Sequence, residues 1–146
     1  MQTKLLHADA QRVFAIILEE GDEVMACLKA FSAKENLGAA QFTAIGAFRR
    51  ARISYFDWDT KSYLPIPVDE QVEVAAFTGD VALGPDGKPA IHAHVVLGRR
   101  DGSALAGHLE EGLVRPTLEI VLTESPAYLK KRHDPESGLA LIAPDA

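Results

Sequence analysis

The feature that most constrains the fold is an alternation of apolar and polar residues with a period of two, interrupted at short intervals by turn sequences. Segments 71–83, 89–100 and 117–124 alternate in this way. Such a period is typical of β-strands, because successive side chains point to opposite faces of a sheet. The sequences GPDGK at 84–88 and DGS at 101–103 are short turns that can join adjacent antiparallel strands. We therefore expect a mostly antiparallel sheet.

One helix is expected near the N-terminus, after a buried strand. The run at 11–18 is apolar on both faces, which predicts a strand covered on both sides. Asp22 is a candidate N-cap, and Asn36 or Gly38 can adopt the left-handed conformation that ends a helix. The apolar positions at helical spacing between them are Val24, Cys27, Leu28 and Phe31. A helix flanking a mostly antiparallel central sheet predicts an α+β fold.

After the helix, the pattern predicts two paired strands and then an irregular connection. The strands are expected at 39–48 and 51–58, with Gly46 at a bulge or a close approach of two backbones. Residues 58–67 are expected to form a turn and irregular structure, because two prolines in this segment lack the N–H that a central strand needs.

Size and composition predict one globular domain that spans residues 1–146. Hydrophobic residues make up 47% and charged residues 25% of the chain, values typical of a protein with one packed core. No apolar run approaches the length of a bilayer span, and the first residues lack the apolar centre of a secretory signal. Cys27 is the single cysteine, which excludes an intramolecular disulfide and a thiolate-rich metal site. A reducing cytoplasm is therefore the expected compartment.

The charge balance argues against DNA binding by this chain alone. The formal net charge is −6, whereas proteins that bind DNA through its phosphates normally present clustered basic surfaces. Two basic clusters are present, FRRAR at 48–52 and LKKRH at 129–133. Solvated loops or strand edges explain them more simply. The candidate DNA contacts, if DNA is bound, are Arg49, Arg50 and Arg52.

Three of the five histidines fall in one short stretch, which raises the question of a metal site. His92 and His94 are separated by one residue on an expected strand, so both point to the same face, with Cβ atoms about 6–7 Å apart. His108 follows the DGS turn, and a short hairpin can return it to the same patch. Gly107 before it lets a neighbouring chain approach closely. His7 and His133 are expected in terminal or loop segments, without an assigned role.

Three neutral imidazoles with one open position are the ligand set of many catalytic zinc sites. Imidazole also binds iron, nickel and copper, so the residues leave the metal open. Exposed histidines on a sheet face are a competing interpretation. Glu73 and Glu119 are candidate carboxylates that orient a ligating imidazole, although a solvated face explains them more simply. Glu110 and Glu111 are expected at the exposed start of a turn or helix.

The ordered blocks GAFRRA, DGKP, HAH, GHL and DPESGL resemble the plants-and-prokaryotes conserved domain, or PPC domain, over about residues 10–142. The resemblance implies an α+β fold on a central antiparallel sheet, a homotrimer, and a metal cluster at His92, His94 and His108. It also implies a link to DNA binding through plant relatives that carry AT-hook segments, but no such hook is present here. Ala106 replaces a glycine, and Asp80 replaces an asparagine, that are usual in the family.

Three functions therefore remain open. The first is a trimeric domain that binds zinc or another divalent transition metal, with a structural role or a catalytic one in hydrolysis of a small substrate. The second is a regulatory module that binds DNA or protein. The third is an assembly scaffold without a ligand.

Overall fold

The computed structural model describes residues 1–7, 11–125 and 129–144, and for residues 2–7 it describes the backbone alone. One helix, α1 (Val24–Lys34), is present in this part of the chain. It is accompanied by nine strands: β1 (Gln2–His7), β2 (Val13–Glu19), β3 (Ala39–Asp57), β4 (Ser62–Val68), β5 (Val72–Leu83), β6 (Pro89–Gly98), β7 (Ala104–Glu124), β8 (Lys131–His133) and β9 (Ala140–Ile142).

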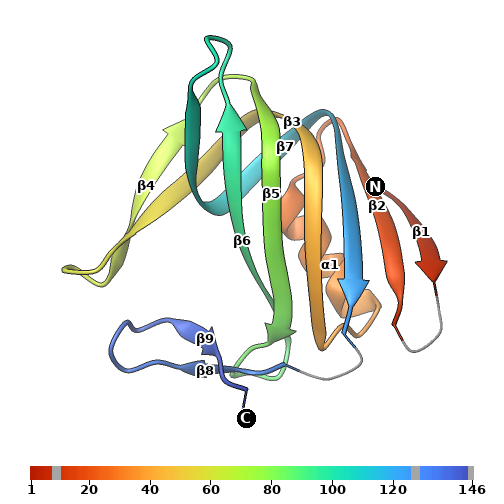
Figure 1. The fold of residues 1–146 in the computed structure, drawn as a ribbon, viewed down its shortest axis with the longest axis vertical. Helices are drawn as coiled ribbons and strands as arrows, with labels where there is room; N and C mark the ends of the chain where they lie inside the picture. The colour runs from red at the N-terminus through yellow and green to blue at the C-terminus, as the bar shows by residue number, and fades with distance from the viewer. Residues whose placement is uncertain (8–10, 126–128, 145–146) are drawn as a thin grey trace.

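Seven of the strands form one antiparallel sheet in the order β1-β2-β7-β6-β5-β3-β4. A further pairing of β7 with β3 closes a circuit of pairings through β5 and β6. The circuit is possible because β3 and β7 are long enough to pair with different strands along their length. Strands β8 and β9 form a separate C-terminal hairpin below the sheet (Figure 1).

The core lies between one face of the sheet and α1, which runs behind the strands in Figure 1. Leu28 and Phe31 of the helix are buried in the same cluster as inward-facing strand residues such as Phe42 and Phe77. Alternation then leaves the next residue of each strand on the opposite face. On β6, Ala93 and Val95 are therefore buried, while the histidines between and beside them face outward.

The antiparallel sheet is as predicted, but the fold is dominated by strands, and a single 11-residue helix accompanies them in the described chain. The helix begins one residue later than expected. Glu23 is the N-cap, and its carboxylate accepts hydrogen bonds from the backbone N–H groups of Met25 and Ala26. Asn36 adopts a left-handed conformation with φ of 53°, as predicted for the residue that ends the helix.

The prediction of two strands at 39–48 and 51–58 is wrong, because β3 is continuous through the arginines between them. A register shift between Phe48 and Arg50 places both Arg49 and Arg50 on the exposed side without ending the strand. Gly46 lies at the expected irregularity: a Cβ there would lie 2.3 Å from the carbonyl oxygen of Thr117.

The irregular connection predicted at 58–67 contains β4, which pairs with the second half of β3. Its prolines, Pro65 and Pro67, are tolerated because β4 is the last strand of the sheet, where a missing N–H leaves no inner partner unsatisfied. No helix in the described residues is long and apolar enough to cross a membrane.

Candidate metal centre

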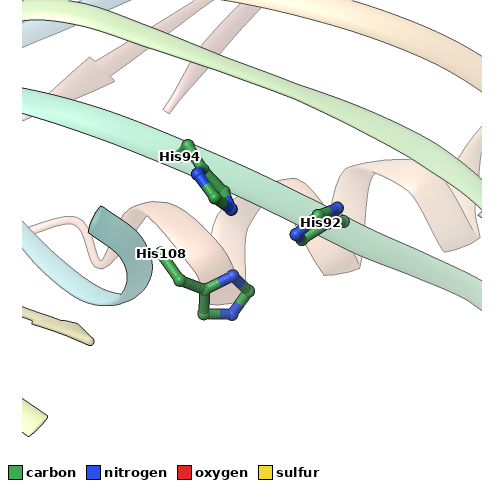
Figure 2. Close-up of side chains that lie close together, drawn as sticks. All are labelled: His92, His94 and His108. Atoms are coloured by element: carbon green, nitrogen blue, oxygen red, sulfur yellow. The ribbon is translucent and has the colours of Figure 1, made fainter. Parts of the chain in front are cut away.

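The three histidines predicted as ligands lie together on the outward face of β6 and β7. His94 is directly opposite His108 in the β6–β7 register, and His92 is two residues from His94 on the same side. The hairpin at 101–103 fixes this register, since Gly102 adopts a φ of 84° and donates its N–H to the carbonyl of Arg99. Figure 2 shows the three imidazole rings pointing toward one another.

Gly107 permits the close approach that seats His108. A Cβ on Gly107 would lie 2.7 Å from the carbonyl oxygen of Ser54 on β3, a contact that backbone atoms cannot accept. Ser54 is itself the register partner of His108, so β3 packs tightly behind the third histidine. The expectation that a residue without a side chain is needed before His108 agrees with this geometry.

The donor set fits a transition metal. One nitrogen from each of His92, His94 and His108 can be chosen so that all three lie within 4.8 Å of one another. In a tetrahedral zinc site with Zn–N bonds of about 2.1 Å, ligand nitrogens are about 3.4 Å apart, so the nitrogens would move closer by up to about 1.4 Å on binding. His108 also has a buried Nδ1 without a hydrogen-bond partner in the described chain, a situation that native proteins normally avoid.

The environment favours neutral imidazoles, the form that binds metal. Burial lowers the pKa of His108 below 6.5, and the neighbouring His92 and His94 lower it further. Burial also lowers the pKa of His94, with a smaller contribution from His92. Near neutral pH, these two rings therefore have free lone pairs.

Asp80 stands behind His92 and was not predicted as a site residue. It is directly opposite His92 in the β5–β6 register, and its Oδ2 lies 3.7 Å from the His92 Nδ1. Its Oδ1 lies 3.0 Å from the Nζ of Lys131 on β8. Burial disfavours the charged carboxylate, but the interactions with His92 and Lys131 outweigh it and lower the pKa of Asp80. A carboxylate beside one imidazole nitrogen leaves the other nitrogen for a metal.

An aromatic wall flanks the cluster on the side of β4. The ring of Tyr63 stacks on His108 with centroids 4.8 Å apart, and Phe56 packs edge-on against Tyr63. Burial raises the pKa of the Tyr63 hydroxyl, as does the negative charge of Glu110, so this hydroxyl stays protonated near neutral pH. This contact was not predicted, because residues 58–67 were not expected to form a strand.

The candidate carboxylates Glu73 and Glu119 lie apart from the histidines. Both line a shallow groove with Ile45, Gly46 and Val74 on the same outward face. Glu73 is opposite Gly98, the last residue of β6, which is four residues beyond His94 and so lies away from the histidine cluster. Asp80 occupies the position beside an imidazole that these two residues were expected to hold. Asp80 and His92 are equally far from the centre of the turn at 84–88, so this pairing could have been predicted from the sequence.

Two of the three arginines at 48–52 are paired with carboxylates. The Nε of Arg52 lies 2.6 Å from Glu110, and an Nη of Arg50 lies 3.6 Å from Glu111. The prediction that these two glutamates begin a turn or helix is wrong: both lie within β7, where Glu111 is the register partner of Arg52. Arg49 is exposed on the same strand.

A family model described as the plants and prokaryotes conserved domain matches residues 6–126. The chain belongs to this family. The predicted resemblance is thereby confirmed over residues 6–126, which include the HAH and GHL blocks and the histidine cluster. A search of curated proteins found no match.

Solved structures of PPC proteins share the fold over nearly the whole chain. A plant- and prokaryote-conserved protein from Pyrococcus horikoshii is 32% identical, with a TM-score of 0.84 over 97% of this chain and 94% of that one. A metal-containing protein from Archaeoglobus fulgidus is 30% identical, with a TM-score of 0.83 over 97% and 96% of the two chains. A candidate DNA-binding protein from Ralstonia eutropha is 30% identical, with a TM-score of 0.82 over 89% and 90%.

Proposed function

We propose that this PPC protein binds one divalent transition metal, with zinc as the first choice, through His92, His94 and His108. The observation that supports the proposal most strongly is the convergence of three imidazole nitrogens within 4.8 Å. The description of the Archaeoglobus fulgidus relative as metal-containing agrees with it. The all-nitrogen donor set suits zinc and also iron, nickel and copper.

Three protein ligands leave a fourth position for water or a substrate, which is the arrangement of catalytic rather than closed structural zinc sites. Bound there, the metal would supply Lewis acidity and a water of lowered pKa, the chemistry of hydrolysis. Tyr63, whose ring stacks on His108, and the Asp80 carboxylate beside His92 are polar residues next to the ligands. Hydrolysis of a small substrate in the cytoplasm is the enzymatic form of the proposal.

The test is metal analysis of protein purified without a chelator and without a polyhistidine tag. We expect about one metal ion per chain, and a loss of that ion in His92→Ala and His108→Ala. His133→Ala is the matched control, because this histidine is exposed at the end of β8. Wild-type protein that takes up no stoichiometric metal when zinc, nickel, iron and copper are supplied would refute the proposal.

We further propose a homotrimer assembled through the outward face of the sheet. Ile45 is 62% exposed and Val121 is 49% exposed, although both lie on central strands of the sheet. They are diagonal neighbours across the β3–β7 pairing, so together they form an apolar area without a covering element in the described chain. Ile45→Lys together with Val121→Lys should yield monomers in analytical ultracentrifugation. A wild-type chain that is already monomeric would contradict this assembly.

DNA binding is the second candidate, favoured by the description of the Ralstonia eutropha relative. The net charge of −6 and the pairing of Arg50 and Arg52 with glutamates argue against it. Binding through Arg49, Arg50 and Arg52 would weaken steeply with salt and would be lost when the three are changed to alanine. Failure to shift duplex DNA at about 50 mM salt would exclude this candidate.

A further inference from the structure

The C-terminal hairpin is attached to the sheet beside the histidine cluster by few interactions. Its strands β8 and β9 pair with each other, and none of their side chains belongs to the main core cluster of the described residues. The backbone attachment lies just before the hairpin. Leu129 accepts a hydrogen bond from the N–H of Leu83 and donates its own N–H to the carbonyl of Gly38, and Lys130 forms a bridge with Leu83. Leu141 and Ile142 of β9 remain exposed.

Lys131 is the exception to this loose attachment. The residue is 6% exposed, although its neighbours Lys130 and Arg132 are exposed. A charged ammonium is rarely buried to this extent unless it is paired, because desolvation of the charge costs several kcal/mol. Its partner is the Asp80 carboxylate at 3.0 Å. The buried ion pair therefore links the hairpin to β5 at the position opposite His92.

Asp80 thus has two partners, one on each oxygen. Oδ1 faces Lys131 of the hairpin, and Oδ2 faces the Nδ1 of His92. A carboxylate held on one side by a buried ammonium has a fixed orientation, and a fixed carboxylate restricts the rotation of the imidazole that it faces. In the other direction, a metal bound to the other nitrogen of His92 would leave its Nδ1 facing the carboxylate, and this would favour the carboxylate orientation that pairs with Lys131.

We propose that Asp80 is a positioning residue for His92, and that through Lys131 it couples metal binding to docking of the C-terminal hairpin. This inference rests on the proposed metal-binding function of the histidine cluster. The coupling is reciprocal: metal stabilises the docked hairpin, and the docked hairpin favours the metal-binding orientation of His92.

Zinc affinity, measured by competition with a chromogenic chelator, tests the positioning role. Asp80→Ala should weaken zinc binding about 10- to 100-fold, the usual effect of removing a carboxylate that orients a ligand. Asp80→Asn keeps an oxygen that accepts the His92 N–H, so it should bind zinc more tightly than Asp80→Ala. Glu73→Ala removes a carboxylate from the same strand, away from the cluster, and should bind zinc as the wild type does.

Hydrogen exchange of the Leu83 amide tests the coupling, because its protection requires the bond to Leu129. Zinc should slow this exchange in the wild type and should have no effect on it in Asp80→Ala or Asp80→Asn, which lack the charge that holds Lys131. Lys131→Met should lose Leu83 protection, whereas Lys130→Met, a change of the exposed neighbour, should retain it.

The outcomes separate this inference from the function on which it rests. Wild-type protein that binds no metal refutes the metal site itself. Wild-type protein that binds zinc, with unchanged affinity in Asp80→Ala, refutes the positioning role. Zinc binding that leaves Leu83 exchange unchanged in the wild type refutes the coupling to the hairpin.

Discussion

Replacing Gly107 by alanine tests the packing that seats His108. The new Cβ would lie 2.7 Å from the carbonyl oxygen of Ser54, whereas a carbon–oxygen contact is comfortable at about 3.3 Å. Strands β3 and β7 would have to separate by about 0.6 Å, and overpacking of this kind costs about 1–3 kcal/mol. Gly98→Ala is the matched control, because its Cβ would make ordinary contacts of 3.7 and 3.8 Å with Glu73.

The two variants share the same loss of unfolded-state entropy, which by itself stabilises by about 0.4–1 kcal/mol. In urea denaturation at one protein concentration, Gly107→Ala should therefore be about 1–3 kcal/mol less stable than Gly98→Ala. Zinc affinity should fall only in Gly107→Ala, because the shift is passed directly to His108. Equal free energies of unfolding for the two variants would refute the reasoning.

Three further predictions concern other parts of the molecule. Arg12→Met should lower the free energy of unfolding by about 1–3 kcal/mol, because the guanidinium bonds Glu124 and Glu35; wild-type stability in urea would contradict this. Hydrogen bonds from the Ser137 hydroxyl and N–H lower the pKa of Asp134 below 3.8, so they stabilise the fold above that pH, and this contribution is lost as the pH falls through the folded-state pKa. In an NMR titration, Ser137→Ala should raise the Asp134 pKa, and an unchanged value would show that the bonds are absent in solution. Removal of metal by a chelator should lower the thermal midpoint, and added zinc at about 100 times its Kd should restore about 2.7 kcal/mol; an unchanged midpoint would favour a scaffold without a ligand.

The convergence of the histidines was predictable because it depends only on local rules. Strand parity places His92 and His94 on one face, and the two-strand hairpin around 101–103 sets His108 opposite His94. Asp80 could have been found in the same way from the 84–88 turn. Glu73 and Glu119 were proposed on parity alone, which identifies the face of a sheet but not the position along it.

Lys131 could not be predicted from its sequence context. It lies in a run of exposed basic residues, and its burial results from docking of a hairpin against a strand about 50 residues earlier in the chain. The continuity of β3 was also not predictable. Two adjacent exposed arginines break the alternation with a period of two, and a bulge at this point lets the strand continue. Such features depend on tertiary packing, which local patterns do not encode.

The most direct test of the metal centre is a crystal structure with anomalous diffraction data collected at the absorption edge of the bound metal. The structure predicts one anomalous peak for each chain, about 2.0–2.1 Å from one nitrogen each of His92, His94 and His108 if the metal is zinc. A zinc-saturated crystal with no peak at this cluster, or with its metal held by other residues, would contradict it.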